Sequence, residues 1–561
     1  MRIIIIGGLS AGPSAAAKAR RENESAEILL FEKTADISYA TCGIPYALSG
    51  VIPSRDKLLV TDVEKLRKRF NIKVHLEEEV LDIDPEARTI TTQLATYGYD
   101  KLIFTTGARA FVPNIQNLNV ADNWATCRNL ADFDKISARA LVPEVNHITI
   151  MGAGLIGIEV AENLRHLGKS VTIIEGGPNI LPMWEPKFAG FAANVLKDKG
   201  VEIITNTFVK KVNTHKDKIT SIELGPEQYI ETDFLIMSVG IKPNTEILKS
   251  KGAHTLPNGA LQVNAYMETS LEGIYAAGDN AGIANLITKE ADYMPLGTHS
   301  NKGGRAAGFN AGTGKHVVQL NGGYKTAIIK VFDHTLARTG LGPKDLLAAK
   351  IPFKRNLTVA GATPEYYPNQ KDMIIETYYH AENHQLLGAE LFGEFGVDKR
   401  VDVLSTAIYA GLKIEDLPQL DLAYAPPYAP AKDPVVVNGF VATNHLLGNY
   451  KEMSVEDLRE LLLKNSDLQI VDLRTDAERM HDGIPTSLHI PLDELRERMH
   501  DLDPARPTVV YCQKGMRGYI GSRILKHHGF DHLYNLAGGM LVWNMFTREH
   551  LVPSLTNELA V

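Results

Sequence analysis

The 561-residue chain is short of cysteine and of long apolar runs. Cys42, Cys127 and Cys512 are its only cysteines, too few and too scattered for a disulfide framework or a zinc site. No stretch approaches the ~20 apolar residues that span a bilayer, and Ile3–Ile6 leads into glycines, which predicts a strand and not a signal peptide. The net charge of −8 argues against nucleic acid as the main partner. We therefore expect a cytoplasmic protein of several domains without a metal site.

The chain opens with a strand, a glycine-rich turn and an Ala-rich helix. Arg2–Ile6 is rich in β-branched residues and leads into Gly7–Gly12, and a second strand, Glu27–Phe31, ends at Glu32. In such a unit the turn approaches a pyrophosphate at the helix N-terminus, and the acidic residue holds a ribose hydroxyl. Leu9 replaces the usual middle glycine, but the other features predict a dinucleotide site.

This unit recurs. The strand His147–Met151 precedes the full GxGxxG turn Gly152–Gly157, and Val171–Ile174 ends at Glu175. Two such units imply two dinucleotides, or one cofactor and one cosubstrate. Glu175 can accept from a ribose 2′-OH and would repel a 2′-phosphate, which favours NADH. Glu159 either faces the nicotinamide or is an ordinary helix carboxylate.

Three further strands are expected to end in turns near the cofactors: Lys101–Phe104 before Thr106 and Gly107, Phe234–Ser238 before Gly240, and a short strand before Gly278 and Asp279. An aspartate at the last position can hold the ribityl chain of a flavin.

Cys42 lies just ahead of Gly43, Ile44 and Pro45, which indicates a position near a helix N-terminus, where the dipole favours a thiolate. No second cysteine is close in sequence, so a redox role requires a thiol from solution. The alternative is a buried structural cysteine, which is how we interpret Cys127.

In this order the segments resemble the pyridine nucleotide-disulfide oxidoreductase family over about residues 1–440. The resemblance implies FAD on the first Rossmann unit, NAD(P)H on the second, and a dimer interface from about Asn321. It places cofactor contacts at Gly7, Gly8, Ser10, Ala11, Gly12, Glu32, Lys33, Val80, Thr106, Gly107, Gly278, Asp279, Pro295, Leu296 and Thr298, and at Gly152, Gly154, Ile156, Gly157, Glu159, Glu175 and Gly240.

The stretch around Cys42 is similar to coenzyme A-disulfide reductases, and less similar to the NADH oxidases and peroxidases of the superfamily. Ser14, Lys18 and Arg21 share a helix face, which is either a solvated surface or a site for the phosphates of coenzyme A. The resemblance implies coenzyme A contacts at Ser14, Lys18, Arg21, Ser38, Thr41, His299 and Lys432, with Arg69 substituting for a family lysine that aligns with Phe70.

Two tyrosines match family positions that reach the other subunit's cysteine, Tyr366 and Tyr424. A phenol at such a position can protonate a departing thiolate. Packing remains the alternative for the nearby Tyr367 and Tyr428.

A new α/β unit begins near Ser454, a predicted helix N-cap. The strand Thr508–Tyr511 leads into a loop from Cys512 to Arg517, in which backbone N–H groups and the arginine favour an anionic sulfur. The unit resembles a single rhodanese domain, with a departure at Asp482–Ser487. Because the cysteine is present, we expect active sulfur handling.

The sequence thus predicts an α/β fold with two Rossmann-like dinucleotide-binding domains, an α+β dimerisation domain and a rhodanese α/β domain. The expected boundaries are 1–111 with 245–320 for FAD, 112–244 for NAD(H), 321–445 for dimerisation, 446–453 as linker, and 454–561 for rhodanese.

The whole chain resembles fusions of a coenzyme A-disulfide reductase with a rhodanese domain. These are taken to be NADH-dependent reductases of coenzyme A persulfide or polysulfide that release hydrogen sulfide. The resemblance implies a homodimer with FAD, NADH and coenzyme A. Two alternatives stay open: an NADH oxidase or peroxidase with a Cys42 sulfenic acid, and a sulfurtransferase in which Cys512 is the main actor.

Overall fold

The computed structural model describes residues 1–464 and 467–548, and the chain forms two compact units. One contains residues 1–178 and 200–324, and the other contains residues 179–199 and the chain from 325 onward. Within the described ranges, no helix has the length and apolar character that a membrane crossing requires.

Two five-stranded parallel sheets of the first unit share one strand order, with the opening strand of each Rossmann unit at the centre. The first sheet runs β3 (Ile72–His75), β2 (Glu27–Phe31), β1 (Arg2–Ile6), β7 (Lys101–Phe104) and β19 (Ile274–Ala276). The second runs β12 (Val201–Ile204), β11 (Ser170–Ile174), β10 (His147–Met151), β16 (Phe234–Met237) and β9 (Trp124–Thr126). Their central strands are mostly apolar, as expected where both faces of a parallel sheet are covered.

The repeat extends to the crossovers. In each Rossmann unit a three-stranded antiparallel sheet connects the third strand to the fourth: β4 (Val80–Asp84), β5 (Thr89–Thr92) and β6 (Thr96–Gly98) in the first, β13 (Lys211–His215), β14 (Lys218–Gly225) and β15 (Gln228–Glu231) in the second. Short strands complete the unit, namely β8 (Ala108–Ala110) with β17 (Ile241–Pro243), and β18 (Leu261–Gln262), β20 (Ala281–Ala284) and β21 (Ala291–Asp292). Its helices are α1 (Ala11–Glu22), α2 (Ile44–Leu48), α3 (Val63–Phe70), α4 (Leu130–Arg139), α5 (Leu155–His166), α7 (Glu246–Ser250) and α8 (Gly297–Thr313).

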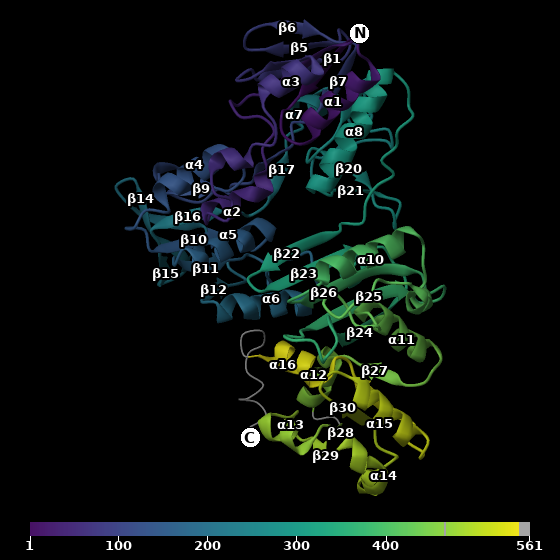
Figure 1. The fold of residues 1–561 in the computed structure, drawn as a ribbon. Helices are drawn as coiled ribbons and strands as arrows, with labels where there is room; N and C mark the ends of the chain where they lie inside the picture. Colours follow the sequence, from purple (N-terminus) through teal and green to yellow (C-terminus); the bar gives the residue numbers. More distant parts are fainter. Residues whose placement is uncertain (465–466, 549–561) are drawn as a thin grey trace. The chain divides into compact units, whose positions relative to one another are not determined.

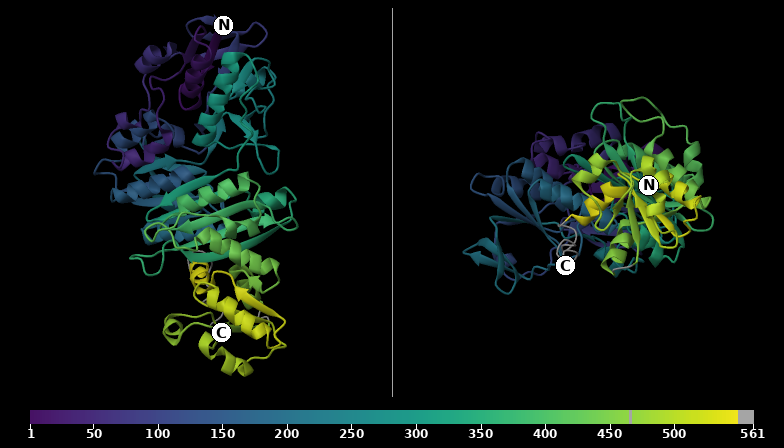
Figure 2. Two further views of the ribbon diagram at one scale, coloured as in Figure 1. Left: turned by 45° about the vertical axis from the view of Figure 1, so that its right-hand side comes forward. Right: turned by 90° about the horizontal axis from the view of Figure 1, so that it is seen from below.

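Helices α1 and α8, far apart in sequence, lie side by side, purple and teal in Figure 1 and again in the left view of Figure 2. Their backbones approach closely at a row of glycines on α8. A Cβ on Gly304 would lie 2.4 Å from the carbonyl oxygen of Ala11, and one on Gly308 would lie 2.2 Å from that of Ala15. This packing fixes the start of α8 beside the first glycine-rich turn.

The second unit is built on an antiparallel sheet in the order β22 (Ala327–Val331), β23 (His334–Gly340), β26 (Leu386–Gly393), β25 (Asp372–His380) and β24 (Phe353–Gly361). Its helices are α9 (Pro343–Ala348), α10 (Val397–Tyr409), α11 (Pro434–Leu446) and α6 (Pro186–Asp198). Helix α6 was expected in the NAD(H) domain, but it packs on this sheet, where the rings of Phe191 and Phe392 are 5.6 Å apart.

The same unit carries a parallel sheet in the order β27 (Lys451–Met453), β31 (Leu533–Leu536), β30 (Thr508–Tyr511), β28 (Gln469–Asp472) and β29 (Leu488–His489). Its helices are α12 (Val455–Leu463), α13 (Asp476–His481), α14 (Leu495–Arg498), α15 (Met516–Lys526) and α16 (Gly539–Thr547). Ser454 caps α12 as predicted, since its side chain accepts from the Asp457 N–H. The placement of residues 451–453 in a linker is corrected, because they form an edge strand that pairs with β31.

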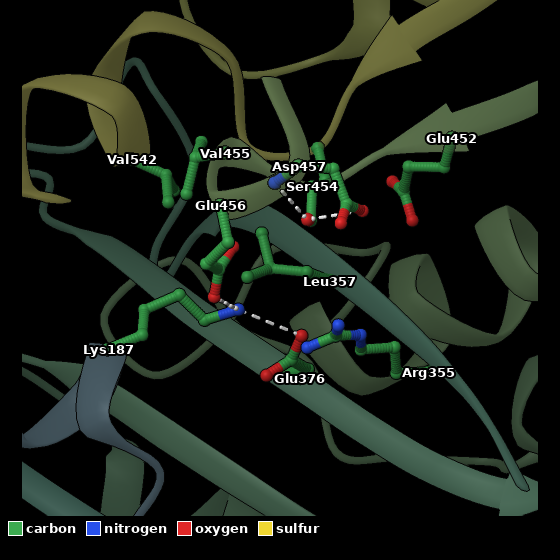
Figure 3. Close-up of a pocket in the computed structure, with 11 residues that line it drawn as sticks. Lys187, Arg355, Leu357, Glu376, Glu452, Ser454, Val455, Glu456, Asp457 and Val542 are labelled. Atoms are coloured by element: carbon green, nitrogen blue, oxygen red, sulfur yellow. Dashed lines mark hydrogen bonds and ion pairs between the residues drawn. The ribbon is translucent and has the colours of Figure 1, made fainter. Parts of the chain in front are cut away.

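A buried ion cluster joins three elements of this unit around a cavity of about 110 Å³. Figure 3 shows Lys187 of α6 between Glu376 of β25 and Glu456 of α12, with N–O distances of 3.0 and 3.2 Å. Burial acts to lower the pKa of Lys187, but the two carboxylates outweigh it and raise that pKa. The lysine is therefore a charged anchor between the antiparallel sheet and the α/β module that follows it.

Candidate active sites

The two glycine-rich turns have matching geometry. Glu32 accepts from the N–H of Gly8 at 2.8 Å, and Glu175 accepts from the N–H of Ala153 at 2.8 Å. Each carboxylate thus holds its turn at the carboxyl end of the sheet, and its remaining lone pairs are available to a ribose.

Close packing explains the glycines of these turns. A Cβ on Gly12 would lie 1.9 Å from the carbonyl oxygen of Gly7, and one on Gly157 would lie 2.0 Å from that of Gly152. Gly7 and Gly152 themselves have φ values of 104° and 99°, a region that favours glycine.

A cavity of about 580 Å³ lies at the first glycine-rich turn. Five predicted FAD residues line it: Gly7, Glu32, Lys33, Val80 and Thr106. Asp279 was predicted to hold the ribityl chain, and its carboxylate forms an ion pair with Arg128 at 2.5 Å. Arg128 also lines the cavity, and no sequence motif marked it.

The other predicted cofactor residues take these positions: Ser10 and Gly154 cap α1 and α5, Ala11 and Ile156 lie in the first turns of those helices, Leu296 caps α8 between Pro295 and Thr298, and Gly107, Gly240 and Gly278 have positive φ. All belong to the first unit.

Cys42 is exposed in a 3₁₀ turn, Thr41–Gly43, directly ahead of α2, as the sequence predicts. Tyr46 of α2 donates to Glu159 of α5 at 3.2 Å, so the cysteine turn is tied to the second Rossmann unit. Burial raises the pKa of Glu159 to about 7, against an opposing effect of the Tyr46 hydrogen bond. Cys127 is buried, and burial raises its thiol pKa to about 12.

A second cavity, of about 500 Å³, brings together four residues predicted for coenzyme A: Ser14, Arg21, Ser38 and Arg69. Ser38 is buried with a φ of 49°, unusual for a residue with a side chain. Its N–H donates to the Gly8 carbonyl at 2.8 Å and its own carbonyl accepts from Val60 at 2.7 Å, which holds it there. Backbone strain of this kind is concentrated at functional sites.

Lys65 and Arg305 line the same cavity and escaped sequence reasoning. Arg305 comes from α8, so only the fold brings it to Arg21 and Arg69. Lys65 lies one turn before Arg69 on α3, and this i,i+4 spacing is a signal that could have identified it. Within residues 1–464 and 467–548, none of these four cations forms an ion pair. The cavity wall therefore presents unpaired positive charge to any ligand.

The remaining predicted coenzyme A residues do not line this cavity. Lys18 pairs with Glu22 and lies over the ring of Phe309. Thr41 adjoins Cys42, and the buried Nδ1 of His299 has no partner within the described part of the chain. Lys432 belongs to the second unit.

The tyrosine pair lies in the second unit. The hydroxyls of Tyr366 and Tyr424 are 3.3 Å apart, and both side chains are exposed. The hydrogen bond to Tyr424 raises the pKa of Tyr366. The two predicted residues thus share one hydrogen bond, although 58 positions separate them.

Cys512 follows β30 and is 2 % exposed. The N–H of Gly515, whose φ is 119°, donates to its sulfur at 3.1 Å. Arg517 forms two bonds to Glu478, at 2.6 and 2.7 Å. Glu478, and then the Cys512 sulfur, raise the pKa of Arg517. Among the described residues the Gly515 N–H donates to the sulfur, and Glu478 is a partner of Arg517 that the sequence did not reveal.

A family model described as pyridine nucleotide-disulphide oxidoreductase matches residues 1–295. The chain belongs to this family. The dimerisation domain of the family matches residues 326–434, and a rhodanese-like domain model matches residues 454–545.

Relatives of this oxidoreductase support the same architecture. It is 32% identical to the NAD(P)H coenzyme A polysulfide/persulfide reductase of Pyrococcus horikoshii over 78% of this chain and 97% of the relative. The crystal structure of reduced Bacillus anthracis CoADR-RHD is similar to this structure, with a TM-score of 0.92 and 34% sequence identity. The match covers 97% of this chain and 98% of the Bacillus anthracis chain. The structure of a NAD-dependent persulfide reductase from A. fulgidus matches with a TM-score of 0.91 and 34% sequence identity. This match covers 97% of this chain and 100% of the A. fulgidus chain.

The oxidoreductase family uses FAD and NAD(P)H, and the first Rossmann unit fits a flavin dinucleotide. The Oδ1 atom of Asn280 is buried and accepts no hydrogen bond from the described residues, although its amide nitrogen donates to Phe104 and Thr106. Asn280 is fully buried and is not part of the cavity lining, so the fit to a dinucleotide rests on Gly7 and Glu32, which line the cavity at the glycine-rich turn.

Proposed function

We propose that this oxidoreductase reduces coenzyme A persulfide, polysulfide and coenzyme A disulfide with electrons from NADH, through Cys42. The observation that carries the proposal is the cavity whose wall holds Arg21, Lys65, Arg69 and Arg305, none of which has a carboxylate partner in the part of the chain that the structure describes. Coenzyme A has a 3′-phosphate and a diphosphate, and clustered guanidinium and ammonium groups suit such anions. Ser38, on the same wall, is four residues from Cys42.

FAD, when bound, supplies the chemistry that passes two electrons from NADH to sulfur. The Cys42 thiolate attacks the inner sulfur of a persulfide, and hydrosulfide leaves as the Cys42–coenzyme A disulfide forms. Two electrons and one proton then cleave this disulfide and give a coenzyme A thiol and the Cys42 thiolate. Cys42 is exposed in the turn ahead of α2, so its sulfur is accessible for attack.

The exposed tyrosine pair is proposed to protonate the departing thiolate. In a homodimer, Tyr366 and Tyr424 would serve the partner's site, and the matched dimerisation domain supports such an assembly. Their shared hydrogen bond uses the O–H of one phenol and leaves the O–H of the accepting phenol available as a proton donor.

Cys512 is proposed to carry sulfane sulfur as a persulfide before it reaches coenzyme A. The Gly515 N–H and Arg517 can stabilise the terminal anion, while nothing in the loop can accept a hydride. Polysulfide in the cytoplasm is the proposed source of this sulfur.

The test measures NADH consumption together with sulfide release. Wild-type protein with coenzyme A persulfide is expected to release one sulfide per NADH. Cys42→Ser is expected to lose turnover and still bind FAD and NADH, whereas Cys127→Ala is the control that keeps turnover. NADH loss with peroxide or water as the product would instead support the oxidase alternative.

A second comparison separates the two cysteines. Cys512→Ser should leave reduction of coenzyme A persulfide largely intact and abolish sulfide release from polysulfide. If Cys512→Ser had no effect with either substrate, the rhodanese domain would be a binding module and the proposed role of Cys512 would be wrong.

A further inference from the structure

The cationic side chains next to Cys512 in sequence have carboxylate partners. They differ in this from the cations that line the cavity of about 500 Å³ in the first unit. Arg517 is paired with Glu478. Lys514, two residues after the cysteine, forms an ion pair with Asp372 at 2.8 Å. The sulfurtransferase loop is therefore nearly neutral apart from its backbone N–H groups.

The partner of Lys514 comes from outside the rhodanese fold. Asp372 is the first residue of β25 in the dimerisation sheet, and Gln370 also donates to it at 2.9 Å. The side chains of Lys514 and Asp372 are 33% and 22% exposed. Because both are largely withdrawn from water, the pair is screened less than a surface ion pair.

Neighbouring contacts keep the loop at this place. A Cβ on Gly538 would lie 2.9 Å from the side chain of Leu357 in β24. The turn ahead of α16 therefore packs closely against the antiparallel sheet. Asn194 of α6 donates to the carbonyl of Met545 in α16 at 2.9 Å. The Lys514–Asp372 pair is thus one part of a continuous contact between the two folds.

We propose that Asp372 determines which sulfur donors Cys512 accepts. By neutralising Lys514 it disfavours dianionic donors such as thiosulfate, and it affects donors of lower charge, such as alkyl persulfides, less. This inference rests on the proposed role of Cys512 as a sulfur acceptor.

The donors are distinguished in the step that transfers their sulfur to Cys512. The thiolate attacks the outer sulfur of thiosulfate, a sulfur–sulfur bond forms, and sulfite leaves with the electron pair of the broken bond. With cysteine persulfide the same attack releases the cysteine thiolate. Thiosulfate brings two negative charges to the anionic cysteine, so a free ammonium nearby would lower the barrier.

The experiment uses the full-length, FAD-loaded protein without NADH. Quenched-flow samples analysed by peptide mass spectrometry give the rate constant for persulfide formation on Cys512 with thiosulfate or with cysteine persulfide. Asp372→Asn is expected to raise the thiosulfate rate constant by about five- to tenfold, and to raise the persulfide rate constant by no more than about two- to threefold, because that donor carries half the charge. The gain should shrink as ionic strength rises from about 0.01 M to about 1 M.

Two variants separate the effect of a freed positive charge from the effect of breaking the Lys514–Asp372 contact. Lys514→Met breaks the same pair without freeing a cation, so it should not raise the thiosulfate rate, and it should remove the gain when added to Asp372→Asn. Asp333→Asn, which breaks an ion pair to Lys199 elsewhere in the unit, is the control for loss of an acidic residue.

The inference is overturned if Asp372→Asn leaves the thiosulfate rate unchanged, if it accelerates both donors equally, or if Lys514→Met alone produces the same gain. Failure of the proposed function is distinct, because then neither donor would load Cys512 in the wild-type protein or in Asp372→Asn.

Discussion

Tyr46 donates a hydrogen bond to Glu159 over 3.2 Å and thereby ties the helix after Cys42 to the first helix of the second Rossmann unit. A second bond, from Ser49 to Asn163 at 2.5 Å, lies one turn further along both helices. The segment that follows Cys42 and the second Rossmann unit are thus in direct contact through side chains.

Glu159 is expected to give NADH oxidation a pH dependence. Burial raises its pKa to about 7, and its carboxylate form favours the cationic nicotinamide that hydride loss creates. The rate of flavin reduction by NADH should therefore rise as pH increases through about 7. Stopped-flow absorbance over pH 5 to 9 should show the transition in the wild type and not in Glu159→Gln.

Tyr46→Phe is the companion variant. The tyrosine hydrogen bond favours the Glu159 carboxylate, so its loss should move the transition to higher pH. An unshifted profile in Tyr46→Phe would show that the hydrogen bond does not act on this titration.

Glu175 is expected to select NADH over NADPH. Its carboxylate is fixed by the N–H groups of Ala153 and Gly177, both at 2.8 Å, so a 2′-phosphate would meet an anchored negative charge. NADH should exceed NADPH by at least tenfold in kcat/KM, about 1.4 kcal/mol, and Glu175→Ala should narrow that ratio. Glu227→Ala, in an exposed turn, is the control, and equal use of both nucleotides by the wild type would refute the assignment.

The sequence predicted several buried strands well because each is a short apolar run bounded by polar residues or turns. Arg2–Ile6, Glu27–Phe31, His147–Met151 and Thr508–Tyr511 were predicted to the residue. Residues 451–453 were misassigned, since three residues at a sheet edge have too little pattern to distinguish a strand from a linker.

Site residues with a local motif were predictable, and those brought in by tertiary structure were not. Arg128 and Arg305 reach their cavities from separate segments, and nothing near them in sequence signals a ligand. Lys65 was overlooked although it lies one turn before the predicted Arg69 on α3. Asp372 and Glu478 act on the Cys512 loop only through the packing of distant segments.

Tyr424 is expected to act in the thiol step and not in the reaction with NADH. Its hydroxyl lies 3.3 Å from that of Tyr366, a geometry suited to proton donation from an exposed phenol. Tyr424→Phe should slow oxidation of the reduced enzyme by coenzyme A disulfide by about 10²-fold or more, with unchanged flavin reduction. Tyr428→Phe, also exposed, is the control. An unaltered oxidative half-reaction in Tyr424→Phe would make this tyrosine a packing residue.

Glu390 is expected to make the second unit less stable at alkaline pH. It is 1% exposed on β26, directly opposite Glu376 of β25, and it accepts from the Glu185 N–H at 3.0 Å. Burial raises its pKa to about 8, despite the opposing charge of Arg338.

A carboxyl group whose pKa is higher in the folded state than in the unfolded chain binds its proton more tightly when folded. The resulting stability is fully present below the unfolded pKa of about 4.5 and is lost as pH rises through about 8.

Glu390→Gln cannot ionise and keeps an oxygen for the Glu185 N–H. Relative to the wild type, it should therefore gain at least about 1 kcal/mol in free energy of unfolding between pH 5 and pH 9. Thermal unfolding by circular dichroism with saturating FAD gives the comparison, and Glu382→Gln, at an exposed position, should follow the wild type. Parallel pH profiles for Glu390→Gln and the wild type would show that Glu390 does not remain protonated in the folded sheet.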